Sequence, residues 1–265
     1  MVLDIGEITS LLFLVILSFI SHKLKMTTLS GTISGIILGL VIILFGSWKW
    51  FIVFILFFLI GSAATKFRLS EKITKGVIEE KRGARNWKNA VSNALPAAIA
   101  ALLFHTHPHV SIFFSSSISS ALADTLATEI GVLSRREPRL ILDLRKKVDV
   151  GYSGGVTLEG YIAAFAGSII ISSSSSILGI SNAGYKGFLA ITVAGLLGCT
   201  VDSLVGATLQ ARYKCSICGK VTESPNHCGE RATLIGGFKW LGNHATNLIA
   251  NLIAGALGLS IFYGI

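Results

Sequence analysis

The feature that most constrains this chain is a succession of long apolar segments separated by polar loops. The segments cover about residues 8–22, 28–45, 48–65, 91–105, 110–131, 155–178, 186–208 and 242–262. About 20 apolar residues are enough for a helix to cross a bilayer. The sequence therefore predicts an all-α polytopic membrane protein, a single integral membrane domain over residues 1–265 with about eight transmembrane helices. Seven helices are an alternative, because the fourth segment is short and contains Pro96, and the fifth carries Asp124 and Glu129.

The composition supports a membrane protein. Hydrophobic residues make up 52% of the chain and charged residues only 14%, against about 25% charged residues in an ordinary soluble domain. A soluble globule of this size needs more charge to cover its surface, so a cytosolic enzyme is disfavoured. Intrinsic disorder is excluded, because disordered chains are poor in apolar residues.

The basic residues are distributed on one side of the predicted helices. Apart from Lys49 and Lys186, all lie in the loops after the first, third, fifth and seventh segments. Three of these loops are long, at residues 66–89, 132–150 and 209–239. The positive-inside rule makes them cytoplasmic and places the N-terminus outside. We therefore expect a multi-pass protein of the cell membrane, whose net charge of +9 reflects topology and not nucleic-acid binding.

Three acids of the fifth and seventh apolar segments lie in the predicted cytoplasmic halves of these segments. Each of Asp124, Glu129 and Asp202 costs roughly 2.5–3.5 kcal/mol to insert, so each needs a reason. Asp124 and Glu129 are about 140° apart on an ideal helix. A joint site therefore needs a third helix or a break before Glu129. The alternative is that the acids pair with buried arginines or cap helix ends.

Two stripes of polar residues enter the membrane from the same side. They are Arg82, Asn86, Asn89 and Asn93 before the fourth segment, and Asn243, Asn247 and Asn251 before the eighth. Such amides either bond to neighbouring helices or line a polar cavity at the depth of the acids.

A glycine-rich turn (DVGYSGGVT, residues 149–157) precedes the sixth segment. Glycines before a helix N-terminus can expose backbone N–H groups to phosphate, although an ordinary loop has the same composition. The candidates are Gly151, Ser153, Gly154 and Gly155. The sequence has no P-loop motif. Carboxylates for Mg²⁺, amides and backbone donors at one membrane face are the set that phosphoryl transfer needs. A transporter is the alternative from another class, but its polar groups should extend through the full membrane depth.

The last long loop contains a cluster of thiols and one imidazole. Cys215 and Cys218 have the spacing of a zinc knuckle, whereas His227 and Cys228 are adjacent, which is unusual for zinc ligands. A cytoplasmic position argues against disulfides. Structural Zn²⁺ and reduced thiols are the two alternatives.

The ordered motifs resemble the phytyl-phosphate kinase family of integral membrane proteins, which is distantly similar to dolichol kinases and CDP-lipid synthases. The similarity runs from about residue 30 to the end and rests on residues 86–93, 123–131 (ADTLATEIG), 151–167 (GYSGGVTLEGYIAAFAG), 201–210 (VDSLVGATLQ) and the closing N-x-x-x-N. The resemblance implies transfer of a phosphoryl group from a nucleoside triphosphate, with CTP favoured, to an isoprenyl monophosphate such as phytyl or geranylgeranyl phosphate. A plant-type transit peptide is not evident, which favours a prokaryotic lipid such as the geranylgeranyl compound.

The resemblance and the residue patterns together assign roles. We expect Asp124, Glu129 and Asp202 to be catalytic and to hold Mg²⁺. The expected nucleotide and phosphate ligands are Arg82, Arg85, Asn89, Asn93, Gly151, Ser153, Gly154, Gly155, Asn243 and Asn247. The partners are the lipid bilayer, the isoprenyl phosphate and the nucleotide, with a homodimer left open. A cytidylyltransferase acting on a lipid phosphate is the alternative enzyme.

Overall fold

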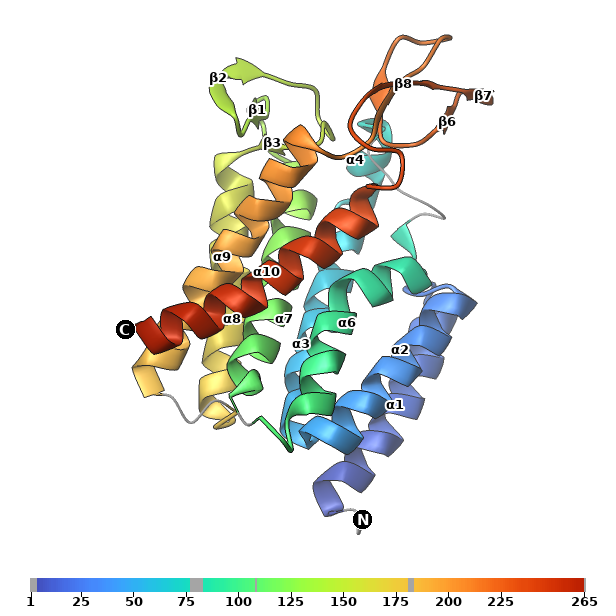
Figure 1. Cartoon of the computed structure of the whole chain (residues 1–265). Coiled ribbons are helices and arrows are strands. Elements are labelled where there is room, and N and C mark those ends of the chain that lie inside the picture. The colour runs from blue at the N-terminus through green and yellow to red at the C-terminus, as the bar shows by residue number, and fades with distance from the viewer. Residues whose placement is uncertain (1–3, 77–82, 108, 181–183, 265) are drawn as a thin grey trace.

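The computed structural model describes residues 4–76, 83–107, 109–180 and 184–264. Its helices form a bundle, in which the last helix crosses its neighbours obliquely (Figure 1). They are α1 (Ile5–Lys23), α2 (Leu29–Val41), continued by the π-helical turn η1 (Ile42–Gly46), α3 (Trp48–Lys66), the short α4 (Leu69–Thr74), α6 (Trp87–Leu103), α7 (Val110–Gly131), α8 (Leu158–Ile177), α9 (Gly184–Thr208) and α10 (Asn243–Gly264).

Within the described residues, seven helices are long and apolar enough to cross a membrane: α1, α2 with η1, α3, α7, α8, α9 and α10. The fourth predicted segment, residues 91–105, corresponds to α6, which has 17 residues and contains Pro96. Its short length and Pro96 are among the reasons that seven helices are the alternative prediction. The predicted all-helical membrane architecture is therefore confirmed, with α6 as the helix that falls below a typical spanning length.

Helix α7 is the centre of the bundle and packs against α3, α6, α8, α9 and α10. Small residues allow this close packing. A Cβ atom on Gly195 of α9 would lie 2.1 Å from Ser119 Oγ, and one on Gly198 would lie 2.2 Å from Ser120 Oγ. Gly258 of α10 contacts Ser116 in the same way. The serines of α7, which lower its hydropathy, therefore form the surface on which α9 and α10 pack closely.

The loops at one end of the bundle contain short strands, which the sequence analysis did not predict. Residues 132–157 include an antiparallel sheet of order β2-β1-β3, and residues 209–242 include one of order β5-β4-β8 and the hairpin β6-β7. We call these two segments the cap. The strands are β1 (Arg139–Leu140), β2 (Asp143–Lys147), β3 (Gly155–Val156), β4 (Arg212–Lys214), β5 (Val221–Thr222), β6 (Asn226–His227), β7 (Glu230–Arg231) and β8 (Thr233–Gly236).

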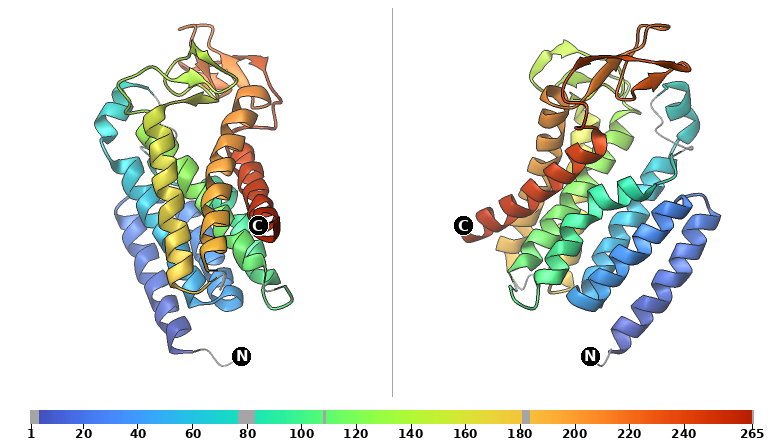
Figure 2. Two further views of the ribbon diagram at one scale, coloured as in Figure 1. Left: turned by 90° about the vertical axis from the view of Figure 1, so that its left-hand side faces the viewer. Right: turned by 45° about the vertical axis from the view of Figure 1, so that its right-hand side comes forward.

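The described parts of the basic loops gather at the capped end, opposite the N-terminus (Figures 1 and 2). Hydrogen bonds connect successive loops there. Thr28 N donates to Arg85 O (3.0 Å), and Lys75 Nζ donates to Val132 O (2.8 Å). The two halves of the cap are joined by Arg212, whose Nη1 donates to Tyr152 Oη (2.9 Å). The alternating distribution of basic residues in the sequence thus corresponds to one physical end of the molecule.

Candidate functional site

The centre of the candidate site is a pair of carboxyl groups at the capped end. Asp124 of α7 and Asp202 of α9 are half-buried, and their carboxyl groups interact electrostatically with each other. One helical turn earlier, Ser120 and Gly198 make the close contact between the same two helices. The small-residue packing therefore places the two acids, predicted from separate segments, against each other.

Asn247 of α10 completes this cluster from a third helix. With its amide nitrogen facing the neighbouring acceptors, Nδ2 donates to Asp202 Oδ1 (3.1 Å) and to the backbone oxygen of Asn243 (2.8 Å). The predicted residues Asp124, Asp202, Asn243 and Asn247 are thus brought together. The first two supply anionic oxygens, and Asn247 orients one of them.

Glu223 adds a third acid, from the cap, that the sequence analysis missed. Its Oε1 accepts a hydrogen bond from Ser153 Oγ (2.6 Å), and its charge acts on both aspartates. Burial raises the pKa of the Glu223 carboxyl above its ordinary value. Carboxylates that lie close together favour the binding of a cation, because the cation reduces their mutual repulsion and the cost of burying their charges.

The predicted glycine turn lies beside this cluster. Gly151 and Gly154 have φ values of +84° and +78°, which favour glycine. A Cβ on Gly154 would lie 2.4 Å from the Ala207 Cβ and 2.8 Å from the Ser203 backbone oxygen. Gly155 N donates to Tyr152 O (2.8 Å), closing the turn. The turn therefore sits tightly on α9 and holds Ser153 toward Glu223.

Replacing Gly154 with alanine is expected to destabilise the protein by about 2–4 kcal/mol, from the left-handed backbone and from overpacking against α9. Gly35→Ala on α2 is the matched control, since a Cβ there meets nothing within 4 Å. Thermal unfolding in detergent measures both. Equal melting temperatures for the two variants would contradict the tight seating of the turn.

Glu129 does not join the aspartate pair. Helix α7 continues without a break to Gly131, so Glu129 stays on a different face from Asp124. Its Oε2 forms an ion pair with Lys72 Nζ of α4 (2.6 Å), and this lysine also donates to the backbone oxygen of Ala64 (2.7 Å). Glu129 therefore forms an ion pair, which was the alternative to metal binding in the sequence-based prediction. Its partner is a lysine and not the expected arginine.

The first amide stripe mostly holds helices in place. Asn86 is the N-cap of α6, and its backbone N–H donates to Asn89 Oδ1 in a capping box. Asn93 is buried and faces Asn251 of α10, with Nδ2 of Asn251 3.5 Å from its Oδ1. The spacing of Asn86 and Asn89 is the signal that could have indicated a helix start. Within the described residues, Asn89 and Asn93 make their hydrogen bonds to residues of α6 and α10 and not to the aspartate pair.

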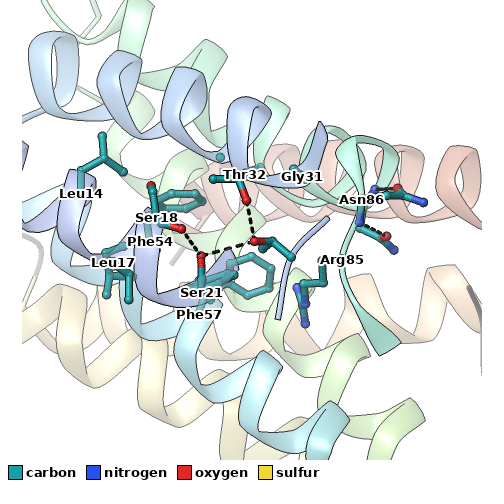
Figure 3. Close-up of a pocket in the computed structure, with 17 residues that line it drawn as sticks. Leu14, Leu17, Ser18, Ser21, Gly31, Thr32, Phe54, Phe57, Arg85 and Asn86 are labelled. Atoms are coloured by element: carbon teal, nitrogen blue, oxygen red, sulfur yellow. Dashed lines mark hydrogen bonds between the residues drawn. The ribbon is translucent and has the colours of Figure 1, made fainter. Parts of the chain in front are cut away.

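Arg85, the predicted arginine that the structure describes, is not at the pair either. Arg82 lies outside the described residues. The Arg85 guanidinium lies over the Phe57 ring (5.4 Å), and its charge acts on Glu129. It also borders a cavity of about 60 Å³ between α1, α2, α3 and α6 (Figure 3).

The cap also carries a basic groove. Its basic residues served in the sequence-based prediction only to orient the chain in the membrane. The groove has a volume of about 480 Å³ and is lined by Arg135, Arg136, Glu137, Arg139 and Lys147. Glu137 pairs with Lys147 (2.5 Å), which leaves a clear excess of positive charge. Such a surface attracts anions to the capped end.

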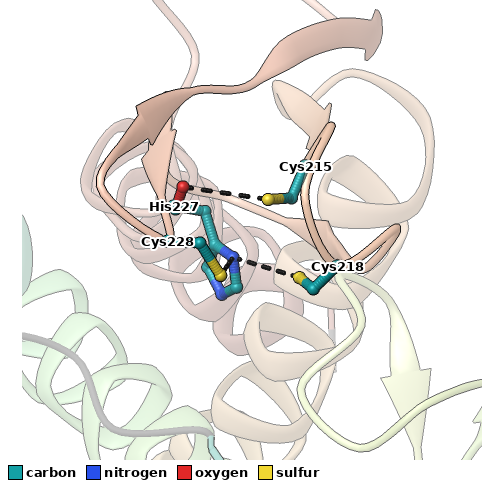
Figure 4. A group of neighbouring side chains, drawn as sticks. All are labelled: Cys215, Cys218, His227 and Cys228. Carbon is teal, nitrogen blue, oxygen red and sulfur yellow. Dashed lines mark hydrogen bonds between the residues drawn. The ribbon is translucent and has the colours of Figure 1, made fainter.

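The thiols and the imidazole of the cysteine cluster lie close together, as a metal site would require. The ligand atoms of Cys215, Cys218, His227 and Cys228 all lie within 4.8 Å of one another (Figure 4). His227 Nδ1 is 3.4 Å from Cys218 Sγ and 3.2 Å from Cys228 Sγ. Backbone N–H groups of Cys218 and Ile217 and the His227 side chain lower the pKa of the Cys215 thiol to about 6. The thiolate is the form of cysteine that binds metals.

Comparison with known proteins supports the resemblance read from the motifs. Residues 12–255 match the family described as "Integral membrane protein DUF92". An uncharacterised membrane protein of Methanocaldococcus jannaschii is 30% identical over 163 residues, which cover 61% of this chain and 67% of that protein. Protein PGR of Arabidopsis thaliana is 31% identical over 276 residues, covering 93% of this chain and 94% of PGR.

A second plant relative is more distant. Protein VTE6, chloroplastic, of Arabidopsis thaliana is 28% identical over 130 residues, which cover 46% of this chain and 39% of VTE6. No solved structure shows significant similarity to the chain. Since the family match covers nearly the whole helical bundle, the chain is a multi-pass membrane protein that belongs to the DUF92 family of integral membrane proteins.

Proposed function

We propose that this protein is a membrane kinase that phosphorylates an isoprenyl monophosphate with a nucleoside triphosphate, CTP being favoured. The observation that carries the proposal is the convergence of Asp124, Asp202 and Asn247 from three helices beneath Glu223 and Ser153 of the cap. The ordered motifs that resemble phytyl-phosphate kinases support the lipid class. The similarity to PGR and VTE6 supports the same choice.

In the proposed reaction, an oxygen of the isoprenyl monophosphate attacks the γ-phosphorus of the nucleotide. The bond from this phosphorus to the β,γ-bridging oxygen breaks, the bonding electrons leave with the nucleoside diphosphate, and an isoprenyl diphosphate is formed. No nucleophile from the protein is needed, since the substrate supplies it. Phosphoryl transfer mainly requires positioning and neutralisation of charge.

Asp124 and Asp202 are the residues that would hold Mg²⁺, which prefers oxygen ligands and carries substrate phosphates with it. The fit rests on the electrostatic interaction between the two carboxyl groups, because a divalent cation bound by both would offset their mutual repulsion. When bound, Mg²⁺ would neutralise charge on the transferred phosphoryl group. Asn247 orients the Asp202 carboxylate, and the Ser153–Glu223 hydrogen bond joins the two halves of the cap beside both acids.

The position of the pair suits a substrate with an apolar tail and a charged head. The carboxyl groups lie near the end of α7 and α9, next to the polar cap, while the rest of both helices is apolar. The tail can therefore stay in the bilayer while the phosphate reaches the acids. The basic groove of the cap lies at the same end and draws in the nucleotide.

The test uses the full-length protein purified in detergent, with Mg²⁺, geranylgeranyl monophosphate, and CTP or ATP in parallel. We expect the lipid to gain the mass of one phosphate and the nucleotide to become the diphosphate. A gain of a nucleotidyl group with release of pyrophosphate would instead make the protein a cytidylyltransferase. No lipid product with either nucleotide, from protein that melts cooperatively, would contradict the proposal.

A further inference from the structure

We propose that Cys215, Cys218, His227 and Cys228 bind one Zn²⁺ ion, and that this ion holds Glu223 over the aspartate pair. The four ligand atoms already lie within 4.8 Å of one another (Figure 4). Tetrahedral Zn²⁺ with Zn–S near 2.3 Å and Zn–N near 2.0 Å requires ligand atoms roughly 3.5–3.8 Å apart. The separations of 3.4 Å and 3.2 Å from His227 Nδ1 to two sulfurs need only small adjustments.

The backbone of the cap is shaped for this ligand set. After β4, Gly219 N donates to Cys215 O (3.0 Å), and Gly219 has a φ of +71°, which closes the turn that carries the first two thiols. In the β6-β7 hairpin, Cys228 itself has a φ of +53°. This conformation is rare and costly for a non-glycine residue. It turns the Cys228 side chain so that two adjacent residues, His227 and Cys228, face the same point.

The ion accounts for the folding of a segment that has little else to hold it. The core of residues 209–242 consists of Ala211, Tyr213 and Ala232, with Leu234 packed against it. The strands there have two to four residues. Segments with such small cores are usually stabilised by a metal or by disulfides. A structural zinc site contributes its binding energy directly to folding.

The zinc ligands flank the acid that reaches the candidate site. Glu223 lies between Cys218 and His227 in the chain, directly after strand β5. Fixing both sides of this stretch holds Glu223 where Ser153 Oγ donates to it (2.6 Å). The zinc ion therefore acts as a positioning element for the cap. This link to catalysis rests on the proposed function, whereas zinc binding itself does not.

Metal content is the first measurement. We expect full-length protein, purified in detergent under reducing conditions, to contain about one zinc per chain by elemental mass spectrometry. Cys218→Ser and Cys228→Ser, at exposed ligand positions, should each lower this content at least about tenfold. Ser216→Ala, in the same turn, and Cys199→Ser, in α9, are the controls and should keep it. Protein that takes up no added zinc, or that forms a disulfide within the cluster instead, would overturn the proposal.

Hydrogen exchange tests the link to Glu223 without any turnover. In Cys218→Ser, peptides covering residues 209–242 and the glycine turn at residues 149–157 should exchange at least about tenfold faster. Peptides from α3 and α8 should be unchanged. Glu223→Gln should keep its zinc and still lose phosphoryl transfer. Unchanged exchange at residues 149–157 after loss of zinc would refute the link, and a failed kinase assay would leave the zinc result standing.

Discussion

Replacing Asp124 or Asp202 with asparagine is expected to lower phosphoryl transfer to the isoprenyl monophosphate at least about 100-fold. The reason is that each variant removes one of the two anionic groups proposed to hold Mg²⁺. Metal-ion stabilisation of transition-state charge is worth several kcal/mol, and each 1.36 kcal/mol is tenfold in rate. Initial rates at saturating Mg²⁺ and nucleotide, followed by mass spectrometry of the lipid, measure the effect.

The control for this prediction is folding. Each asparagine keeps the shape of the side chain and removes one of two like charges that lie together. We therefore expect the melting temperature of the metal-free variants to equal or exceed that of the wild type. Addition of Mg²⁺ should raise the melting temperature of the wild type only, by mass action. Wild-type turnover in both variants would show that the site lies elsewhere.

Replacing Glu129 with glutamine is expected to act on stability and not on chemistry. Its partner Lys72 has a side chain that is only 4% exposed, against 20% for Glu129. Loss of one member of a buried ion pair costs about 3–5 kcal/mol. The partial exposure of Glu129 reduces this to about 2–3 kcal/mol. The melting temperature should fall clearly, while turnover per folded molecule stays within about tenfold of the wild type.

A double variant separates the two roles that the sequence left open for Glu129. Combining Lys72→Met with Glu129→Gln removes both charges and should recover most of the lost stability. If Glu129→Gln instead melts like the wild type and loses turnover as Asp124→Asn does, then Glu129 is a site residue after all. The comparison thus decides between the ion pair of the structure and the metal ligand of the sequence analysis.

The helices could be predicted well from sequence because bilayer thickness and apolarity define them strongly. The segment predicted at 110–131 is α7 at Val110–Gly131, and the one predicted at 155–178 is α8 at Leu158–Ile177. The sequence predicted that Asp124 and Asp202 lie at a similar depth in the membrane, but it did not predict that they lie next to each other. The actual contact depends on Ser120 and Gly198 one turn away, which the sequence showed only as small residues.

The assignments that changed depended on tertiary contacts. The 140° separation of Glu129 from Asp124 was visible, but the partner Lys72 lies in α4, a short helix in a predicted loop. Glu223 carried no signal, since it is one acid in a polar loop and approaches the site only through the fold of the cap. The same holds for the strands, which have two to five residues and no clear alternation.

The short helix α6 has a consequence for the lipid around the protein. At 1.5 Å per residue, its 17 residues extend about 26 Å, whereas the hydrocarbon core measures about 30 Å. Ile99, Leu102 and Leu103 are 41–49% exposed, so one face of α6 meets acyl chains. A hydrophobic segment shorter than the core thins the bilayer locally. Such thinning beside α6 would bring lipid headgroups closer to the midplane, and it would shorten the path of the isoprenyl phosphate that we propose as substrate.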